Sequence, residues 1–134
     1  FIKASEINPR NPESYVYWGL TLSMMGKQEE AIEKYETAIK LDPENSNAHA
    51  YLGASLNQMG KPEESIGHLE QALKLDTLNV IAYNALIDIF YDAKRYAKAW
   101  ETVFRARKVN LNLSQDSIDR LAHKMPESNA KNNP

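Results

Sequence analysis

The 134-residue sequence contains no cysteine. Disulfide frameworks, thiolate nucleophiles and zinc sites built on cysteine are therefore excluded. Histidine is also scarce, with three residues, which leaves little material for general acid–base catalysis or for a metal centre. No apolar stretch approaches the roughly 20 residues that a membrane-spanning helix needs, so we expect no membrane span.

An excess of charge of one sign is missing as well. The 16 Lys and Arg residues are balanced by 18 Asp and Glu residues, and the formal net charge is −2. A protein that binds nucleic acid through its overall field is usually strongly basic, so nucleic acid is not an expected partner. Hydrophobic residues make up 43% of the chain and charged residues 25%, which is typical of one packed domain and excludes wholesale disorder.

What the sequence does contain is an internal repeat of 34 residues. Small and apolar residues return at this interval in several independent columns. These columns include Ala4, Ala38, Ala72 and Ala106; Ile7, Leu41, Leu75 and Val109; Gly19 and Gly53; and Gly26 and Gly60. Because the columns share one period, they predict a repeat protein.

Each unit contains two helical patterns separated by a break. In the first unit, Asn11–Glu13 offers a capping side chain, a proline at the first helical position and an acid near the positive helix end. Apolar residues then recur every three or four positions until Gly26, which predicts a left-handed turn. A second helix is predicted from about Gln28 to Leu41, and Asp42-Pro43 ends it.

These columns resemble the tetratricopeptide repeat pattern, Trp-x2-Leu-Gly-x2-Tyr, then Ala-x3-Phe, then Pro. The first copy carries the pattern at Tyr15, Trp18, Gly19, Leu22, Ala31, Tyr35, Ala38 and Pro43, and the second at His49, Leu52, Gly53, Leu56, Ser65, Leu69 and Ala72. The third copy is degenerate, because Ile87 and Lys94 stand where the family has glycine, and we expect its local packing to differ. The resemblance implies an all-α fold, a right-handed α-solenoid of helix-turn-helix repeats.

The repeat register divides the chain into consecutive segments. They are 1–11, the end of a truncated preceding repeat; 12–45, 46–79 and 80–113, three repeats; 114–125, a C-terminal capping helix; and 126–134, a flexible tail. The capping helix is predicted because Ile118, Leu121 and Met125 share one apolar side, while charged residues occupy the other. The tail contains nothing to bury.

No catalytic site, metal site or cofactor is predicted. His49 stands in a column that is tyrosine in the other copies, so we expect it to pack between helices. Glu64 and His68 are four residues apart and could both touch a metal, but no third ligand is evident, and a solvated pair is the better interpretation. We therefore do not expect the chain to be an enzyme or to take a small-molecule substrate.

The strongest functional signal lies on the first helix of each repeat. It is the side opposite the apolar residues that pack against the second helix. The resemblance implies that these sides line a concave groove in which peptides bind. The predicted groove residues are Val16, Tyr17, Leu20, Met24, Asn47, Tyr51, Asn57, Gln58, Asn84, Asp88, Tyr91 and Asp92. Aromatic side chains supply contact area and amides can hold a peptide backbone, which suits an extended or helical segment.

The groove departs from the family members that clamp a free carboxylate with Lys, Arg and Asn. Other residues stand in those columns, namely Val16, Leu20, Tyr51, Ile81 and Ala85. Asp88 and Asp92 favour positive charge at the third-repeat end instead. A basic stripe that includes Lys98 and Arg105 is interpreted as an ordinary helix face.

The predicted function is a non-catalytic protein–protein interaction and scaffolding module that binds a mainly apolar peptide or helix of a protein partner. Two alternatives stay open. The chain could be the non-catalytic arm of a larger enzyme, such as a glycosyltransferase, or a self-assembling scaffold that associates through its solenoid ends.

Overall fold

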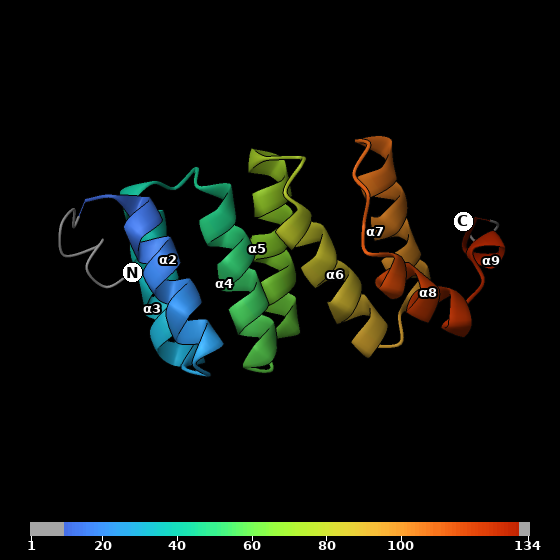
Figure 1. The fold of residues 1–134 in the computed structure, drawn as a ribbon, viewed down its shortest axis with the longest axis horizontal. Helices are drawn as coiled ribbons and strands as arrows, with labels where there is room; N and C mark the ends of the chain where they lie inside the picture. The colour runs from blue at the N-terminus through green and yellow to red at the C-terminus, as the bar shows by residue number, and fades with distance from the viewer. Residues whose placement is uncertain (1–9, 132–134) are drawn as a thin grey trace. The chain divides into compact units, whose positions relative to one another are not determined.

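The computed structural model describes residues 10–131, so the predicted end of a preceding repeat lies almost entirely outside the described residues. Within them the chain is helical and has no strand (Figure 1). The helices are α2 (Pro12–Met24), α3 (Gln28–Leu41), α4 (Ser46–Gln58), α5 (Pro62–Leu75), α6 (Val80–Asp92), α7 (Tyr96–Lys108), α8 (Gln115–Lys124) and α9 (Glu127–Lys131). The predicted all-α fold of paired helices is confirmed.

The first helix of each repeat begins after an asparagine. The side-chain oxygens of Asn11, Asn45 and Asn79 each accept a backbone N–H from the first turn, at 2.9, 3.0 and 3.2 Å. Such N-caps satisfy a donor that the helix itself leaves without a partner. The three residues form one column of the 34-residue repeat.

The turn between the two helices of a repeat needs a residue in the left-handed conformation. Gly26 and Gly60 supply it with φ of 80°, and Lys94 takes the same place in the third repeat with φ of 61°. In all three turns this residue's N–H donates to the carbonyl three residues earlier, at 3.0 Å. The backbone of the turn therefore follows the same path in the third repeat, although lysine replaces glycine there.

Residues up to Ala82 form one compact unit, in which α2 with α3 and α4 with α5 make two antiparallel hairpins (Figure 1). The helices of each hairpin approach at a glycine. A Cβ atom on Gly19 would lie 2.5 Å from Cε1 of Tyr35, and one on Gly53 would lie 2.7 Å from Cγ of Leu69. Both glycines are therefore required by close helix contact.

Residues from Tyr83 onward form the second compact unit, where the third repeat solves the same packing problem differently. Ile87 replaces the glycine and is buried, with 3% of its surface exposed. The column that holds Tyr35 and Leu69 in the other copies holds the smaller Val103, which is fully buried. The third repeat thus combines a larger residue in the glycine column with a smaller one in the Tyr35 column, and both are buried.

The helix predicted for residues 114–125 is present as α8, and it packs on α7. Its central anchor, Leu121, is fully buried, and Ile118 is partly buried. The indole N–H of Trp100 on α7 donates to the carbonyl of Met125 at 2.8 Å. Packing and this hydrogen bond hold the end of α8 against the third repeat.

The prediction of a flexible tail from residue 126 is wrong for residues 127–131, which form α9 against α7. Ala130 is buried, and the Glu127 carboxylate lies 3.1 Å from the Arg107 guanidinium. A single alanine and one ion pair are signals too small to recognise in a polar stretch of sequence.

We predict that Lys94→Gly stabilises the protein by about 0.5–1 kcal/mol. A left-handed conformation costs a residue with a side chain about 1–2 kcal/mol, and the greater freedom of glycine in the unfolded chain offsets part of that gain. Urea denaturation measures the change. The reverse variant, Gly60→Lys, should destabilise the protein, and a Lys94→Gly variant less stable than the parent would contradict the argument.

A second prediction concerns α8. Replacing Leu121 by Ala should lower the free energy of unfolding by about 2–5 kcal/mol, because it opens a cavity at a fully buried position. Thermal denaturation followed by circular dichroism measures the effect. His123→Ala is the matched control, since His123 is exposed on the same helix. Equal melting of both variants would show that α8 does not stabilise the fold.

Candidate functional site

The predicted groove residues of α2 divide by exposure. Tyr17 and Met24 are 51% and 81% exposed, and Leu20 is partly buried. Val16, in contrast, is 2% exposed and packs with Ala38 and Ala48 between α2, α3 and α4. The prediction that Val16 lines a groove is therefore wrong, because its column is needed to join neighbouring repeats.

Tyr51 on α4 both packs and remains partly accessible. Its ring stacks on the buried ring of Tyr35, with centroids 5.8 Å apart and planes 17° apart. Burial, and secondly the neighbouring Tyr17, raise the pKa of Tyr51 above its ordinary value. Tyr17 and Tyr51 thus lie close together on the first unit.

The predicted amide residues are largely engaged within the molecule. The Asn47 side-chain oxygen accepts from Nδ2 of Asn79 at 3.1 Å, and that of Gln58 accepts from Nε2 of Gln28 at 3.5 Å. Asn57 is partly buried. The side-chain oxygens of Asn47 and Gln58 therefore already accept a hydrogen bond within the molecule.

The N-cap asparagines also bridge repeats, which sequence reasoning missed. Nδ2 of Asn45 donates to the Glu13 carboxylate at 2.6 Å, and Nδ2 of Asn79 donates to Ser46 Oγ at 2.7 Å and to Asn47. Each asparagine caps its own helix through oxygen and reaches the preceding first helix through nitrogen. The signal that could have found this contact is the asparagine column itself.

In the second unit, Arg120 of α8 covers part of the predicted face of α6. Its guanidinium lies 3.9 Å from the Asp88 carboxylate and 5.3 Å from the centre of the Tyr91 ring. Partial desolvation raises the pKa of Asp88 above its ordinary value although its side chain stays more than half exposed, Arg120 opposes this shift, and Asp92 adds to it. Asp88 is therefore not an unpaired acid.

The remaining predicted residues of α6 surround this contact. Tyr91 meets Tyr96 edge to face, with centroids 5.7 Å apart, so its ring lies between a tyrosine and the Arg120 cation. Asp92 is exposed and Asn84 is partly buried. Arg120 was missed because α8 was considered only for the apolar side that it buries.

The histidines of the second repeat lie together. His49 is buried, and its Nε2 lies 3.1 Å from the carbonyl oxygen of Pro43. Its Nδ1 lies 3.4 Å from Nδ1 of His68. Among residues 10–131, no group of three or more His, Cys, Asp or Glu residues could hold a metal ion. Within the same range, no helix is both long and apolar enough to span a membrane.

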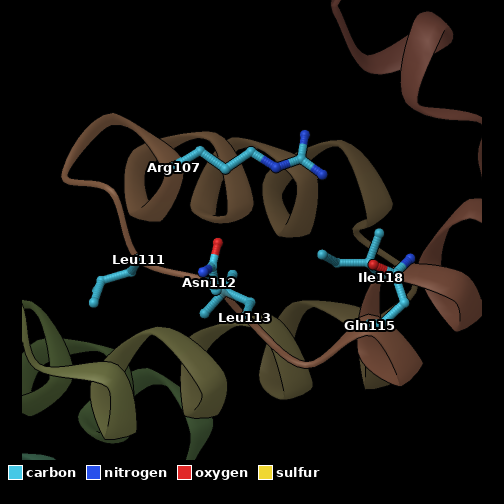
Figure 2. Close-up of a pocket in the computed structure, with 6 residues that line it drawn as sticks. All are labelled: Arg107, Leu111, Asn112, Leu113, Gln115 and Ile118. Atoms are coloured by element: carbon cyan, nitrogen blue, oxygen red, sulfur yellow. The ribbon is translucent and has the colours of Figure 1, made fainter.

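Two hollows among residues 10–131 include no predicted groove residue. One, of about 270 Å³, lies in the second unit and is lined by Arg107, Leu111, Asn112, Leu113, Gln115 and Ile118. Figure 2 shows Arg107 extended along one side of the 111–113 segment and Ile118 at its far end. The other, of about 360 Å³, lies at the turns of the first unit and is lined by Gly26, Lys27, Gln28, Glu29, Glu30 and Met59.

Neither hollow includes a histidine or pairs an acid with a nucleophile. The hollow of the second unit is also smaller than the roughly 300–1,000 Å³ typical of small-molecule sites. The candidate site considered below is the exposed face of the first helices, where Tyr17 and Met24 are 51% and 81% exposed.

Comparisons with known proteins agree with this architecture. A TPR repeat model matches residues 19–60 and a tetratricopeptide repeat model matches residues 55–109, so the two together span residues 19–109. No curated protein matches the chain. A solved structure described as "Functional Characterization of Pseudomonas Aeruginosa pilF" is similar over 96% of this chain, with a TM-score of 0.74 and 23% identity.

This chain spans 60% of the pilF structure, and at such identity the likeness shows the fold alone. It confirms the α-solenoid class. Repeats of this kind act generally as protein-interaction modules, since their stacked helices present an extended surface to other chains. The matched repeat models and the helix-turn-helix pairs lead to one conclusion: the chain belongs to the tetratricopeptide repeat family.

Proposed function

We propose that the chain is a non-catalytic scaffolding module that binds a mainly apolar peptide or helix of a protein partner on the first helices of its first unit. We define the tyrosine face as Tyr17, Leu20 and Met24 of α2 together with Tyr51 of α4. The observation that carries the proposal is the exposure of large apolar side chains on one helix, 51% for Tyr17 and 81% for Met24.

The tyrosine face combines a rigid part with an adaptable part. Tyr51 is held by its stack on Tyr35, so a partner that contacts it orders no further side chain. Met24 lies seven residues after Tyr17 on the same side of α2, and methionine adapts to irregular apolar surfaces. Tyrosine adds area with a polar tip that stays hydrated until a partner binds.

Charge at the tyrosine face argues against a partner that ends in a free carboxylate. The face has no Lys or Arg, and the nearby acid Glu13 is bonded to Asn45. A carboxylate leaving water for this surface would find no cation to offset its lost hydration. An internal apolar segment of the partner is therefore favoured over its terminus.

The second unit contributes a weaker preference, for positive charge on the partner. A cationic side chain of a partner would have to compete with Arg120 for Asp88 and Tyr91. Both members of the Arg120–Asp88 pair are more than half exposed, and ion pairs of this kind contribute little to stability. We therefore infer that Asp88 and Asp92 affect the rate and salt dependence of association more than its final affinity.

The proposal predicts that Tyr17→Ala weakens binding by more than tenfold and leaves helical content unchanged. Truncation of an aromatic hot spot usually costs about 2 kcal/mol or more, and 1.4 kcal/mol is already a factor of ten. The partner would be captured with the parent chain, its bound segment mapped with peptides, and each variant titrated against that peptide by calorimetry. Met24→Ala should show a smaller loss in the same assay.

Met25→Ala is the matched control for Met24→Ala, because Met25 is 61% exposed but lies in the turn beyond α2. Lys98→Ala tests the basic stripe of α7, where Lys98 is exposed. Both controls should bind as the parent does. Loss of binding with Lys98→Ala, together with full binding by Tyr17→Ala, would move the functional surface to the basic stripe and sink the proposal.

A further inference from the structure

His49 on α4 and His68 on α5 face each other inside the second repeat. Their Nδ1 atoms are 3.4 Å apart, their ring centres are 5.6 Å apart, and the rings are inclined by 25°. The Nδ1 atoms lie closer together than the ring centres, so each ring turns its Nδ1 toward the other. His49 is 8% exposed, while His68 is only partly buried.

The surroundings of His49 decide which nitrogens carry hydrogen. Its Nε2 lies 3.1 Å from the Pro43 carbonyl oxygen, which can only accept, so Nε2 is the donor. A neutral imidazole carries one hydrogen, so the Nδ1 of His49 is an acceptor. The Nδ1 of His68 must then donate to it, and the Nε2 of His68 is the nitrogen left with a lone pair.

A first proton can therefore bind the pair without breaking either hydrogen bond. It would add to Nε2 of His68, and Nδ1 of that ring would still donate to His49. Two acids support this positive charge, Glu36 on α3 and Glu64 on α5, and both raise the pKa of His68. Burial and the adjacent His49 act in the opposite direction and outweigh them, so the pKa of His68 lies below its ordinary value.

A second proton has no such place. It would have to bind Nδ1 of His49, which would set two N–H donors against each other at the present 3.4 Å separation. It would also bring two like charges together in a site where one ring is buried. The short distance between the two rings therefore disfavours a second positive charge once the first proton is bound.

We propose that His49 and His68 form a shared proton site, which takes up one proton in the folded second repeat and excludes a second, so that this repeat loses stability as the pH falls. In the unfolded chain both imidazoles bind protons with midpoints near about pH 6.5. The folded pair binds fewer protons below that pH. The stability it contributes is thus complete above about pH 6.5 and is lost progressively as the medium becomes more acidic.

The other repeats lack this device. The repeat columns that contain His49 and His68 hold Tyr15 and Lys34 in the first copy and Tyr83 and Thr102 in the third. Lys34 lies 3.9 Å from the centre of the Trp18 ring instead. The sister repeats therefore supply replacements that the fold already accepts in these columns, His49→Tyr and His68→Thr.

The test follows the histidine ring resonances of the full chain by NMR from about pH 8 to about pH 5, with urea denaturation at each pH. Exposed His123 serves as the internal reference. We expect the pair to complete only one titration step before unfolding, with a midpoint below the ordinary histidine value. For each proton that the folded pair fails to bind, the unfolding equilibrium constant should rise about tenfold for every pH unit of acidification.

The double variant His49→Tyr/His68→Thr should lose this excess pH dependence, and the control His123→Gln should keep it. If the double variant does not fold, His68→Thr alone serves, because His49 then faces no second imidazole. The proposal is overturned if both rings titrate fully in the folded chain with midpoints near that of His123. It is equally overturned if removing the pair leaves the pH dependence of unfolding at the parent's value.

Discussion

The structure depends on how closely the two helices of a repeat can approach. In the first two repeats a glycine on the first helix allows Tyr35 or Leu69 of the second helix to fill the space that a Cβ would occupy. That contact buries the inner stripe of each helix and fixes which side remains outward. The third repeat has no glycine in this column, and there Ile87 and the smaller Val103 are both buried. The interaction surface that we propose is the part of the first helices that this packing leaves exposed.

Tyr51 shows how the same packing prepares a surface for a partner. One side of its ring rests on Tyr35, and the rest remains accessible beside Tyr17. The side chain is therefore immobilised during folding, before any partner arrives. Arg120 does the opposite on the second unit, where it places a half-exposed cation beside Tyr91 and Asp88. The two units thus offer a partner different surfaces, one bare and one already occupied by a weak internal contact.

The fold was predictable because its signals repeat: periodic apolar residues, caps and turns recur every 34 positions and reinforce one another. Contacts that depend on a single residue were not predictable from the sequence. Val16 was predicted to lie on the outward side of α2. A helix within a solenoid is covered on two sides, however, and Val16 lies on the side that packs against the next repeat. Residues 127–131 and Arg120 carry no periodic signal, since each depends on one long side chain meeting one partner. The contact between His49 and His68 likewise depends on how α4 packs against α5, which the sequence pattern does not specify.

The bridging asparagines have a consequence for how such an array can grow. Asn45 and Asn79 each start a helix and, with the same amide, hold the repeat before it. Every copied block of 34 residues would therefore carry its own connector, so an added repeat would need no new junction. Leu113 occupies the next position of this column and has no amide to offer. The junction between the third repeat and α8 therefore lacks this side-chain bridge, and α8 attaches through Leu121 and the Trp100–Met125 hydrogen bond instead.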